Sequence, residues 1–277
     1  MKKTKKRRLA ISFLRFVFLL ILIFFLAFFL AGGTSVFSPK TWQHLGDFLP
    51  KVEAQLPAIQ QTDSQVVVST TDRISRFIFI KRAVDARINH ENYVKIRDIP
   101  ESLQQAIVAV EDTRFYSHHG FDIQGIMRAT LVNIQYGQIE EGASTITQQL
   151  VKNLFLSNEQ SYGRKAEELL LALDLEANYS KDEILELYLN TIYYGSNYYG
   201  IGPAAEGYFG KKPSALQLPE SAMLAGLPNA PSLYSPYVDF LMAKKRQFIV
   251  IDAMEHNGYI DESTAASAKI KPIYLAH

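Results

Sequence analysis

Residues 101–122 read ESLQQAIVAVEDTRFYSHHGFD, an apolar run that ends in a cluster of carboxylates, an arginine and two histidines. Leu103, Ile107 and Glu111 fall at i, i+4 and i+8, which predicts a helix over about 101–111 with Glu111 on its apolar face. Partial burial and the negative end of the helix dipole both raise a carboxyl pKa, as a general base near neutral pH requires. The alternative is a charge cluster that only caps the helix end.

Composition narrows the possible partners. The chain has 277 residues, 48% of them hydrophobic, which is enough for one large domain or two small ones. Seven of its 29 Lys and Arg residues lie in the first fifteen positions, where there is no acidic residue, so the rest of the chain has 22 basic and 28 acidic residues. A general nucleic-acid surface is therefore not expected. There are no cysteines, so thiolate metal sites and disulfides are excluded.

The N-terminus predicts a membrane anchor. A basic tail over 1–8 precedes an apolar run over 9–31 that is interrupted only by Arg15, and these 23 residues would span roughly 34 Å as a helix. The run is longer than the apolar core of a cleaved signal, although Ala31-Gly32-Gly33 leaves cleavage as the alternative. The positive-inside rule then puts the N-terminus in the cytoplasm and the following residues outside the plasma membrane.

The rest of the chain predicts a juxtamembrane linker over 32–64 and one mainly α-helical domain over 65–277. β-rich runs at 66–69, 77–80 and 93–96 predict a small hairpin or sheet before the first long helix. Beyond residue 99 the pattern is helical, with capping signals at Ser144 before 145–154, at Ser180 with Glu183, and at Ser214 with Gln217.

A second polar constellation, residues 142–153, reads GASTITQQLVKN. On a helix these positions form a polar stripe with one cation, and two hydroxyls stand at its N-terminus, an arrangement that suits an anionic oxygen. The alternative is an amphipathic helix that faces water. The residues concerned are Ser144, Thr145, Gln148, Gln149, Lys152 and Asn153.

Three further segments also contain residues that could carry chemistry. Glu168 lies four residues after Arg164 and three after Lys165, so two cations are expected to keep it charged; a purely structural salt bridge is the alternative. The apolar continuation over 169–175 is expected to be buried. Segment 181–190 predicts a packing helix followed by tyrosines that pack in the core or line a sugar groove, and 244–251 begins a late helix with three cations.

Together, these five segments resemble, in order, glycosyltransferase family 51, the peptidoglycan glycosyltransferases that polymerise lipid II. The resemblance covers about 66–260, and Ile251 stands where the family usually has leucine. The matching residues are Glu111, Asp112, Phe115, His118, Gly120 and Asp122, then Gly142 through Asn153, then Arg164, Lys165 and Glu168, then Lys181, Ile184, Leu185, Tyr188, Leu189 and Asn190, and finally Arg246 and Val250.

The resemblance implies a lysozyme-like, mainly α-helical glycosyltransferase domain with a small β element, preceded by one transmembrane helix. It implies inverting transfer onto the 4-hydroxyl of a lipid-linked disaccharide, with Glu111 as general base and Glu168 arranging the donor diphosphate, which a divalent cation (Mg²⁺ or Mn²⁺) could accompany. Lys152, Arg164, Lys165 and Arg246 would stabilise the diphosphate. The other expected substrate-binding residues are Asp112, His118, Ser144, Thr145, Gln148, Gln149 and Asn153.

The expected partners are lipid II, the nascent glycan strand and the plasma membrane. An anchor raises the effective concentration of lipid-tethered substrates, and Ile123, Ile126, Met127 and Leu131 would either enter lipid or pack in a core. No Ser-x-x-Lys or Lys-Thr-Gly motif occurs, so a monofunctional enzyme is expected, with cross-linking by partner transpeptidases or other cell-wall proteins. The competing hypotheses are a lysozyme-like glycan hydrolase and a non-catalytic scaffold. Adjacent His118 and His119 do not fit zinc spacing.

Overall fold

The computed structural model describes residues 79–136, 142, 144–156 and 162–276. The chain divides into two compact units, 1–65 and 66–277, and every described residue belongs to the second. The predicted tail, anchor and linker therefore lie outside the described residues, and they stay predictions. Within the described ranges, no helix is both long and apolar enough to cross a membrane.

The described part of the chain is helical, as predicted, and its only β pairing there is one isolated bridge between Tyr193 and Tyr199. Short 3-10 turns lie at Ile96–Asp98, Phe115–Ser117, Pro213–Ala215 and Leu227–Asn229. The α-helices are α4 (Ile80–Asp85), α5 (Glu101–Glu111), α6 (Ile123–Tyr136), α7 (Ile146–Phe155), α8 (Tyr162–Asn178), α9 (Lys181–Thr191), α10 (Ile201–Phe209), α11 (Leu218–Gly226), α12 (Pro231–Tyr234), α13 (Phe240–His256) and α14 (Glu262–Ile270).

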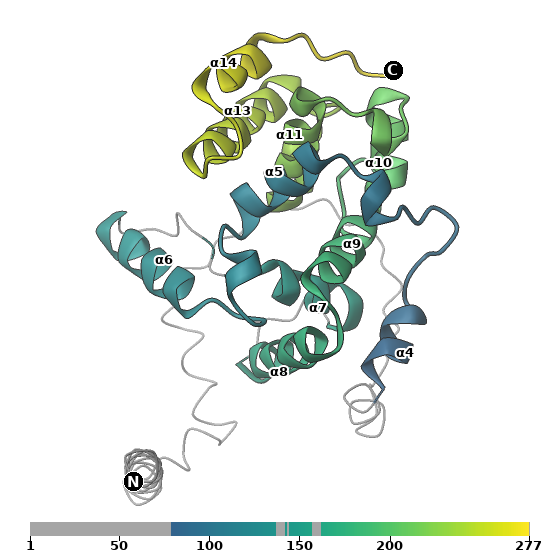
Figure 1. Ribbon diagram of the computed structural model, residues 1–277, viewed down its shortest axis with the longest axis vertical. Helices are drawn as coiled ribbons and strands as arrows, with labels where there is room; N and C mark the ends of the chain where they lie inside the picture. The colour runs from purple at the N-terminus through teal and green to yellow at the C-terminus, as the bar shows by residue number, and fades with distance from the viewer. Residues whose placement is uncertain (1–78, 137–141, 143, 157–161, 277) are drawn as a thin grey trace, which may run out of the picture. The chain divides into compact units, whose positions relative to one another are not determined.

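The helices form two packed groups (Figure 1). Helices α5, α11 and α13 pack against one another, with α14 on the outside of α13, while α7 packs against both α8 and α9. Every residue of α11 from Pro219 to Gly226 is buried, as expected of a helix that is covered on all sides. The predicted helix over 101–111 is confirmed as α5, with Leu103 and Ile107 fully buried.

Capping explains where three helices begin. The predicted box of Ser180 and Glu183 is confirmed at α9. At α7 the prediction was one residue early, because Thr145, and not Ser144, caps the helix in a box with Gln148. The prediction at Ser214 was wrong, because Pro213–Ala215 forms its own 3-10 turn and the box before α11 pairs Gln217 with Glu220.

The predicted strand at 93–96 is not present, because side chains of α9 bind the backbone that a neighbouring strand would have paired. Asn190 Oδ1 accepts from the Val94 N–H at 2.8 Å, and its Nδ2 donates to the Val94 carbonyl at 2.8 Å. Glu186 accepts from the Ile96 N–H at 2.7 Å. Of the other predicted strands, 66–69 lies outside the described residues, and Ile80 begins α4 instead.

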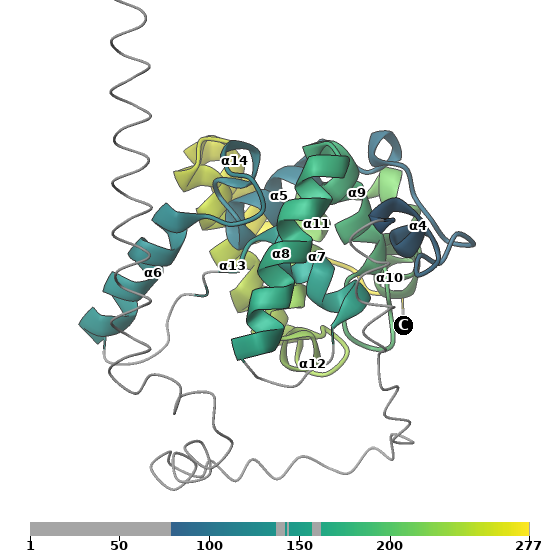
Figure 2. The same cartoon turned by 90° about the horizontal axis from the view of Figure 1, so that it is seen from below.

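The prediction that 169–175 is buried throughout was wrong. Leu171 and Leu175 are fully buried, but Leu170 and Leu173 are exposed. Helix α8 packs mainly on α7, α9 and α4, and Figure 2 shows no other helix of the described residues over its remaining side. The late helix also begins earlier than expected, since Asp239 caps α13 by accepting from the Met242 N–H.

Candidate active site

Glu111 ends α5 with its carboxylate buried. Gln149 Nε2 on α7 donates to Glu111 Oε2 at 2.9 Å, while Oε1 has no hydrogen-bond partner among the described residues. Burial raises the pKa of Glu111; the Gln149 hydrogen bond and the Arg246 charge oppose this, and the Asp112 charge adds to it. The direction is the one predicted from the position of Glu111 on the apolar face of the helix.

Asp112 and His118 join this helix end to the start of α7. Asp112 Oδ2 lies 2.9 Å from His118 Nε2 and accepts the Ile146 N–H at 3.0 Å, so the carboxylate also satisfies the N-terminus of α7. Thr145 Oγ1 donates to the Gly120 carbonyl at 2.8 Å. These contacts fix α7, and through it Gln149, relative to Glu111.

Glu168 lies on α8 with both cations that the sequence had assigned to it. Arg164 Nη1 donates to Glu168 Oε2 at 3.0 Å, and Lys165 Nζ donates to Oε1. Lys165 also donates to Ser144 Oγ at 3.2 Å, so α8 and the residues before α7 share one polar network. Because both Glu168 oxygens already accept from cations, Glu168 holds these cations in place.

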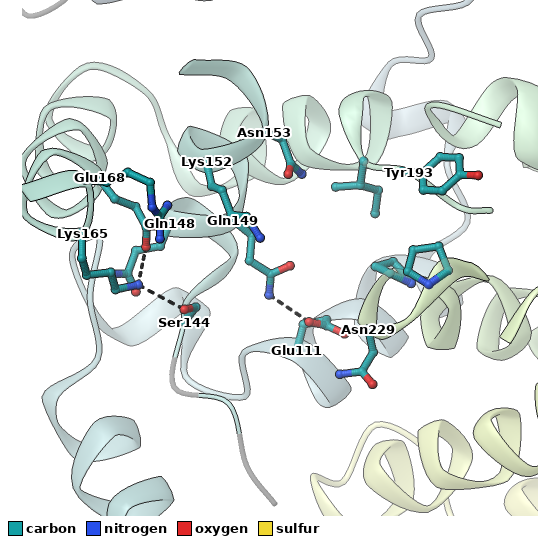
Figure 3. A pocket seen from close by; sticks show the side chains of 14 residues that line it. Glu111, Ser144, Gln148, Gln149, Lys152, Asn153, Lys165, Glu168, Tyr193 and Asn229 are labelled. Carbon is teal, nitrogen blue, oxygen red and sulfur yellow. Dashed lines mark hydrogen bonds and ion pairs between the residues drawn. The ribbon is translucent and has the colours of Figure 1, made fainter. Parts of the chain in front are cut away.

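One cavity brings Glu111 and Glu168 together (Figure 3). Its volume is about 400 Å³, and the walls come from α5, α7, α8 and the segments that follow α9 and α11. Of the predicted site residues it collects Glu111, Ser144, Gln148, Gln149, Lys152, Asn153, Arg164, Lys165 and Glu168.

Glu111 also lines a second cavity of about 520 Å³, together with residues of α6 and α13. It contains Arg246, whose Nη2 lies 3.9 Å from Glu111 Oε1. Arg246 therefore lies beside the predicted base and not with the other three predicted cations. Asp112 and Thr145 also line this second cavity, whereas buried His118 lines neither one.

Several lining residues were not predicted. Asn229 lines both cavities and lies next to Glu111 in Figure 3. Ile192, Pro228 and Pro231 line the first cavity, and no motif of the sequence had marked them. Tyr193 also lines it, so one member of the tyrosine cluster faces the cavity while Tyr194 is fully buried.

The donor set does not fit a divalent cation. Both Glu168 oxygens accept from Arg164 and Lys165, whose positive charges would repel a metal ion placed there. Within the described ranges, no three His, Asp or Glu side chains form a group that could hold a metal. The expected Mg²⁺ or Mn²⁺ stays a prediction, and no chemical step is derived through it.

A buried carboxylate that lines a cavity with several cations, and that has one oxygen without a hydrogen-bond partner among the described residues, suits transfer of a glycosyl group from an anionic leaving group. The family model described as Transglycosylase matches residues 80–255, so the chain belongs to the transglycosylase family.

Penicillin-binding proteins are among its curated relatives. The chain is 37% identical to penicillin-binding protein 1A/1B of Bacillus subtilis (strain 168), over 97% of this chain and 28% of that protein. It is 38% identical to penicillin-binding protein 1A of Vibrio cholerae serotype O1, over 91% and 29%. The chain thus spans less than a third of the length of these relatives. A crystal structure of penicillin-binding protein 1A from Haemophilus influenzae matches with 26% identity, covers 66% of this chain and 18% of that chain, and gives a TM-score of 0.40.

Proposed function

We propose that this chain is an inverting peptidoglycan glycosyltransferase that polymerises lipid II into glycan strands and releases undecaprenyl diphosphate, in cell-wall biosynthesis. The observation that carries the proposal is the position of Glu111. Its buried carboxylate has one oxygen without a hydrogen-bond partner among the described residues, and it lines two cavities, one of which is rich in cations. A base between two cavities fits a reaction that joins an acceptor to a donor.

The chemistry follows from that position. Glu111 Oε1 takes the proton of the acceptor 4-hydroxyl while the hydroxyl oxygen attacks the anomeric carbon of the donor. The bond from that carbon to the diphosphate oxygen breaks, and its electron pair leaves with the diphosphate. Attack and departure on opposite faces invert the configuration. The raised pKa of Glu111 makes its carboxylate a stronger base than an exposed one.

The cations of the first cavity suit the leaving group. Lys152 on α7 and the pair of Arg164 and Lys165 on α8 line the same cavity as Glu111. Glu168 holds that pair in place before substrate arrives, so positive charge is preorganised where negative charge develops on the diphosphate. A diphosphate stabilised in this way does not need a strong general acid.

The same contacts disfavour the hydrolase. Glycan cleavage by two carboxylates requires that both be able to exchange a proton or attack carbon. Glu168 accepts from two cations, and a hydrolase has no diphosphate for Lys152, Arg164 and Lys165 to stabilise.

The exposed apolar side chains of helix α6 favour substrates that are held at a membrane. Its apolar side chains are exposed where sequence analysis left lipid contact and core packing as alternatives. A large exposed apolar surface is typical of membrane or protein contact. We place the α6 face against the plasma membrane that carries lipid II, with the catalytic domain on its outer side and transpeptidases as cross-linking partners. The exposed residues are Ile123, Ile126, Met127, Leu131 and Ile134.

The deciding experiment is polymerisation of labelled lipid II by the purified full chain in detergent, with products resolved by size. We expect long glycan from the wild type, and Glu111→Gln to be slower by about 10²- to 10⁴-fold, the usual contribution of a general base. The matched control is Glu101→Gln, an exposed glutamate on the same helix, which should polymerise normally.

Other outcomes would redirect the assignment. A folded wild type that makes no polymer would indicate a binding-only scaffold, and shortening of preformed glycan strands would indicate the hydrolase. Equal rates for Glu111→Gln and the wild type would contradict the proposed base.

A further inference from the structure

A buried hydrogen-bond chain reaches Glu111 from a third helix. The Tyr188 hydroxyl on α9 donates to Gln149 Oε1 at 3.0 Å, and Gln149 Nε2 donates to Glu111 Oε2 at 2.9 Å. Tyr188 is fully buried. Figure 3 shows the second of these bonds, with Gln149 pointing from α7 to the carboxylate. The chain therefore connects α9, α7 and α5 at the base.

The amide of Gln149 has two possible orientations, and they favour different forms of Glu111. With the NH₂ group toward the carboxylate, the amide donates to a charged oxygen and favours the ionised form. With the carbonyl toward it, two acceptors face each other unless Glu111 carries a proton. The orientation of this amide therefore biases the protonation of Glu111.

The Tyr188 hydroxyl favours one of these two orientations of the Gln149 amide. Burial raises the pKa of Tyr188 well above its ordinary value, so its hydroxyl keeps the proton and is available as a donor. Within the described residues, Gln149 Oε1 is the acceptor of that proton. Rotating the amide would leave the buried hydroxyl without an acceptor, which costs free energy.

We propose that Tyr188 is a positioning residue for the base: by donating to the Gln149 carbonyl it holds the amide NH₂ toward Glu111 Oε2, and Oε1 remains the oxygen that accepts the proton. The inference rests on the proposed function, in which Glu111 is the general base. It adds a residue that lies outside both cavities and acts through Gln149.

Other charged groups around Glu111 also affect its pKa, and the test must separate their effect from that of Tyr188. Asp112 follows it on the chain and Arg246 approaches from α13; these are the charges that shift its pKa. The other charged or titratable groups that line the two cavities are Lys152, Arg164, Lys165, Glu168, Tyr193, Asp122, Arg128 and His256. Replacing Tyr188 by Phe alters none of these groups, so a change in the titration of Glu111 would come through Gln149.

The test is the pH dependence of lipid II polymerisation by the full chain carrying Tyr188→Phe. Losing the hydroxyl frees the amide to turn its carbonyl toward a protonated Glu111. The acidic limb of the rate profile should move to higher pH by about one unit. On the acidic side, the variant should therefore be about tenfold slower than the wild type, and at alkaline pH the two rates should be equal. The matched control is Tyr194→Phe, a buried tyrosine whose hydroxyl lies 3.5 Å from the Leu189 carbonyl.

A second readout does not need activity. In protein with ¹³C-labelled glutamate carboxyls, the Glu111 resonance is assigned by its absence in Glu111→Gln, and its titration midpoint should rise in Tyr188→Phe but not in Tyr194→Phe. If Tyr188→Phe does not fold, Gln149→Met, which removes the amide donor itself, should raise the same midpoint.

The outcomes separate the two proposals. An active wild type whose acidic limb is unmoved by Tyr188→Phe, or whose rate falls equally at every pH, would overturn the positioning role and leave the glycosyltransferase intact. A folded but inactive wild type would overturn the function, and the carboxyl titration would still decide whether Tyr188 acts on Glu111.

Discussion

At the scale of the residue, Glu111 is placed where burial and charge oppose each other. The packing of three helices removes water from its carboxylate. In place of water, the carboxylate has a hydrogen bond from the Gln149 amide and the Arg246 guanidinium 3.9 Å away. Burial is the larger effect, so its pKa is raised. In the proposed function this makes Glu111 a stronger base at the expense of stability, as is common at functional sites.

This cost makes the stability of the protein depend on pH. The unfolded chain releases the Glu111 proton near pH ~4.3, whereas the folded chain keeps it to higher pH. Between these two values the folded state binds more protons, so stability falls as pH rises through the folded pKa. The Glu111→Gln variant has no carboxyl at this position, so it should not lose stability in this way as pH rises.

We therefore expect Glu111→Gln to unfold at a higher temperature than the wild type at pH 7.5, and at the same temperature near pH 4. Thermal unfolding followed by circular dichroism at both values measures this, with Glu101→Gln as the exposed control that should show no such difference. A variant less stable than the wild type at pH 7.5 would contradict the inferred burial penalty.

At the scale of the element, α7 is the part on which the site depends. It contributes Gln149 to the base and Lys152 to the cation-lined cavity, and its N-terminus is held by Asp112 and Thr145. Thr145 both caps the helix and bonds the Gly120 carbonyl. Loosening this end should change the position of the residues that follow it.

We expect Thr145→Ala to lower the free energy of unfolding by about 1–2 kcal/mol, the usual cost of losing a cap and a buried hydrogen bond. Polymerisation should also slow several-fold. The control is Asp261→Ala, which removes the cap of α14 away from both cavities. It should also lower stability in urea denaturation but leave the rate unchanged. Equal activity of the two variants would show that the α7 cap does not position the site.

The close approach of α11 and α13 determines where Arg246 lies beside Glu111. A Cβ at Gly226 would lie 2.8 Å from Arg246 Cγ, and Arg246 Nε donates to the Gly226 carbonyl at 3.3 Å. Glycine at this position therefore leaves room for the arginine that approaches Glu111.

At the scale of the whole molecule, the apolar face of α6 lies beside one wall of the second cavity, so a membrane that covered α6 would be next to that cavity. Gly125 and Arg128 of α6 line the cavity, while Met127 and Leu131 are exposed. In the proposed function, lipid-linked substrates would then reach Glu111 without leaving the bilayer surface.

The absence of cysteine allows a direct measurement of this contact. A bilayer-sensitive fluorophore on Met127→Cys, in the full chain reconstituted into vesicles, should shift to the blue and be quenched by brominated lipid. The same label on exposed Glu262→Cys of α14 should show neither effect. Equal quenching at both positions would contradict membrane contact by α6.

Much of the fold could be predicted because the deciding interactions are local. The apolar repeat of α5, the box of Ser180 and Glu183, and the pairing of Glu168 with Arg164 and Lys165 all depend on residues three or four positions apart. The errors arose where distant groups intervened. Glu186 and Asn190 bind the backbone of 93–96 in place of a strand, and the packing of α8 leaves Leu170 and Leu173 exposed.

Periodicity and short spacing account for the features that could be predicted: the helical class, the ends of α5 and α9, the burial of Glu111, and the motifs that resemble the transglycosylases. Which residues meet depends on the tertiary packing. It placed Arg246 beside the base, added Asn229 to both cavities, and connected Tyr188 to Glu111 through Gln149. Those residues lie far apart in the chain, and their proximity results from the packing of α5, α7, α9, α11 and α13, which no local pattern records.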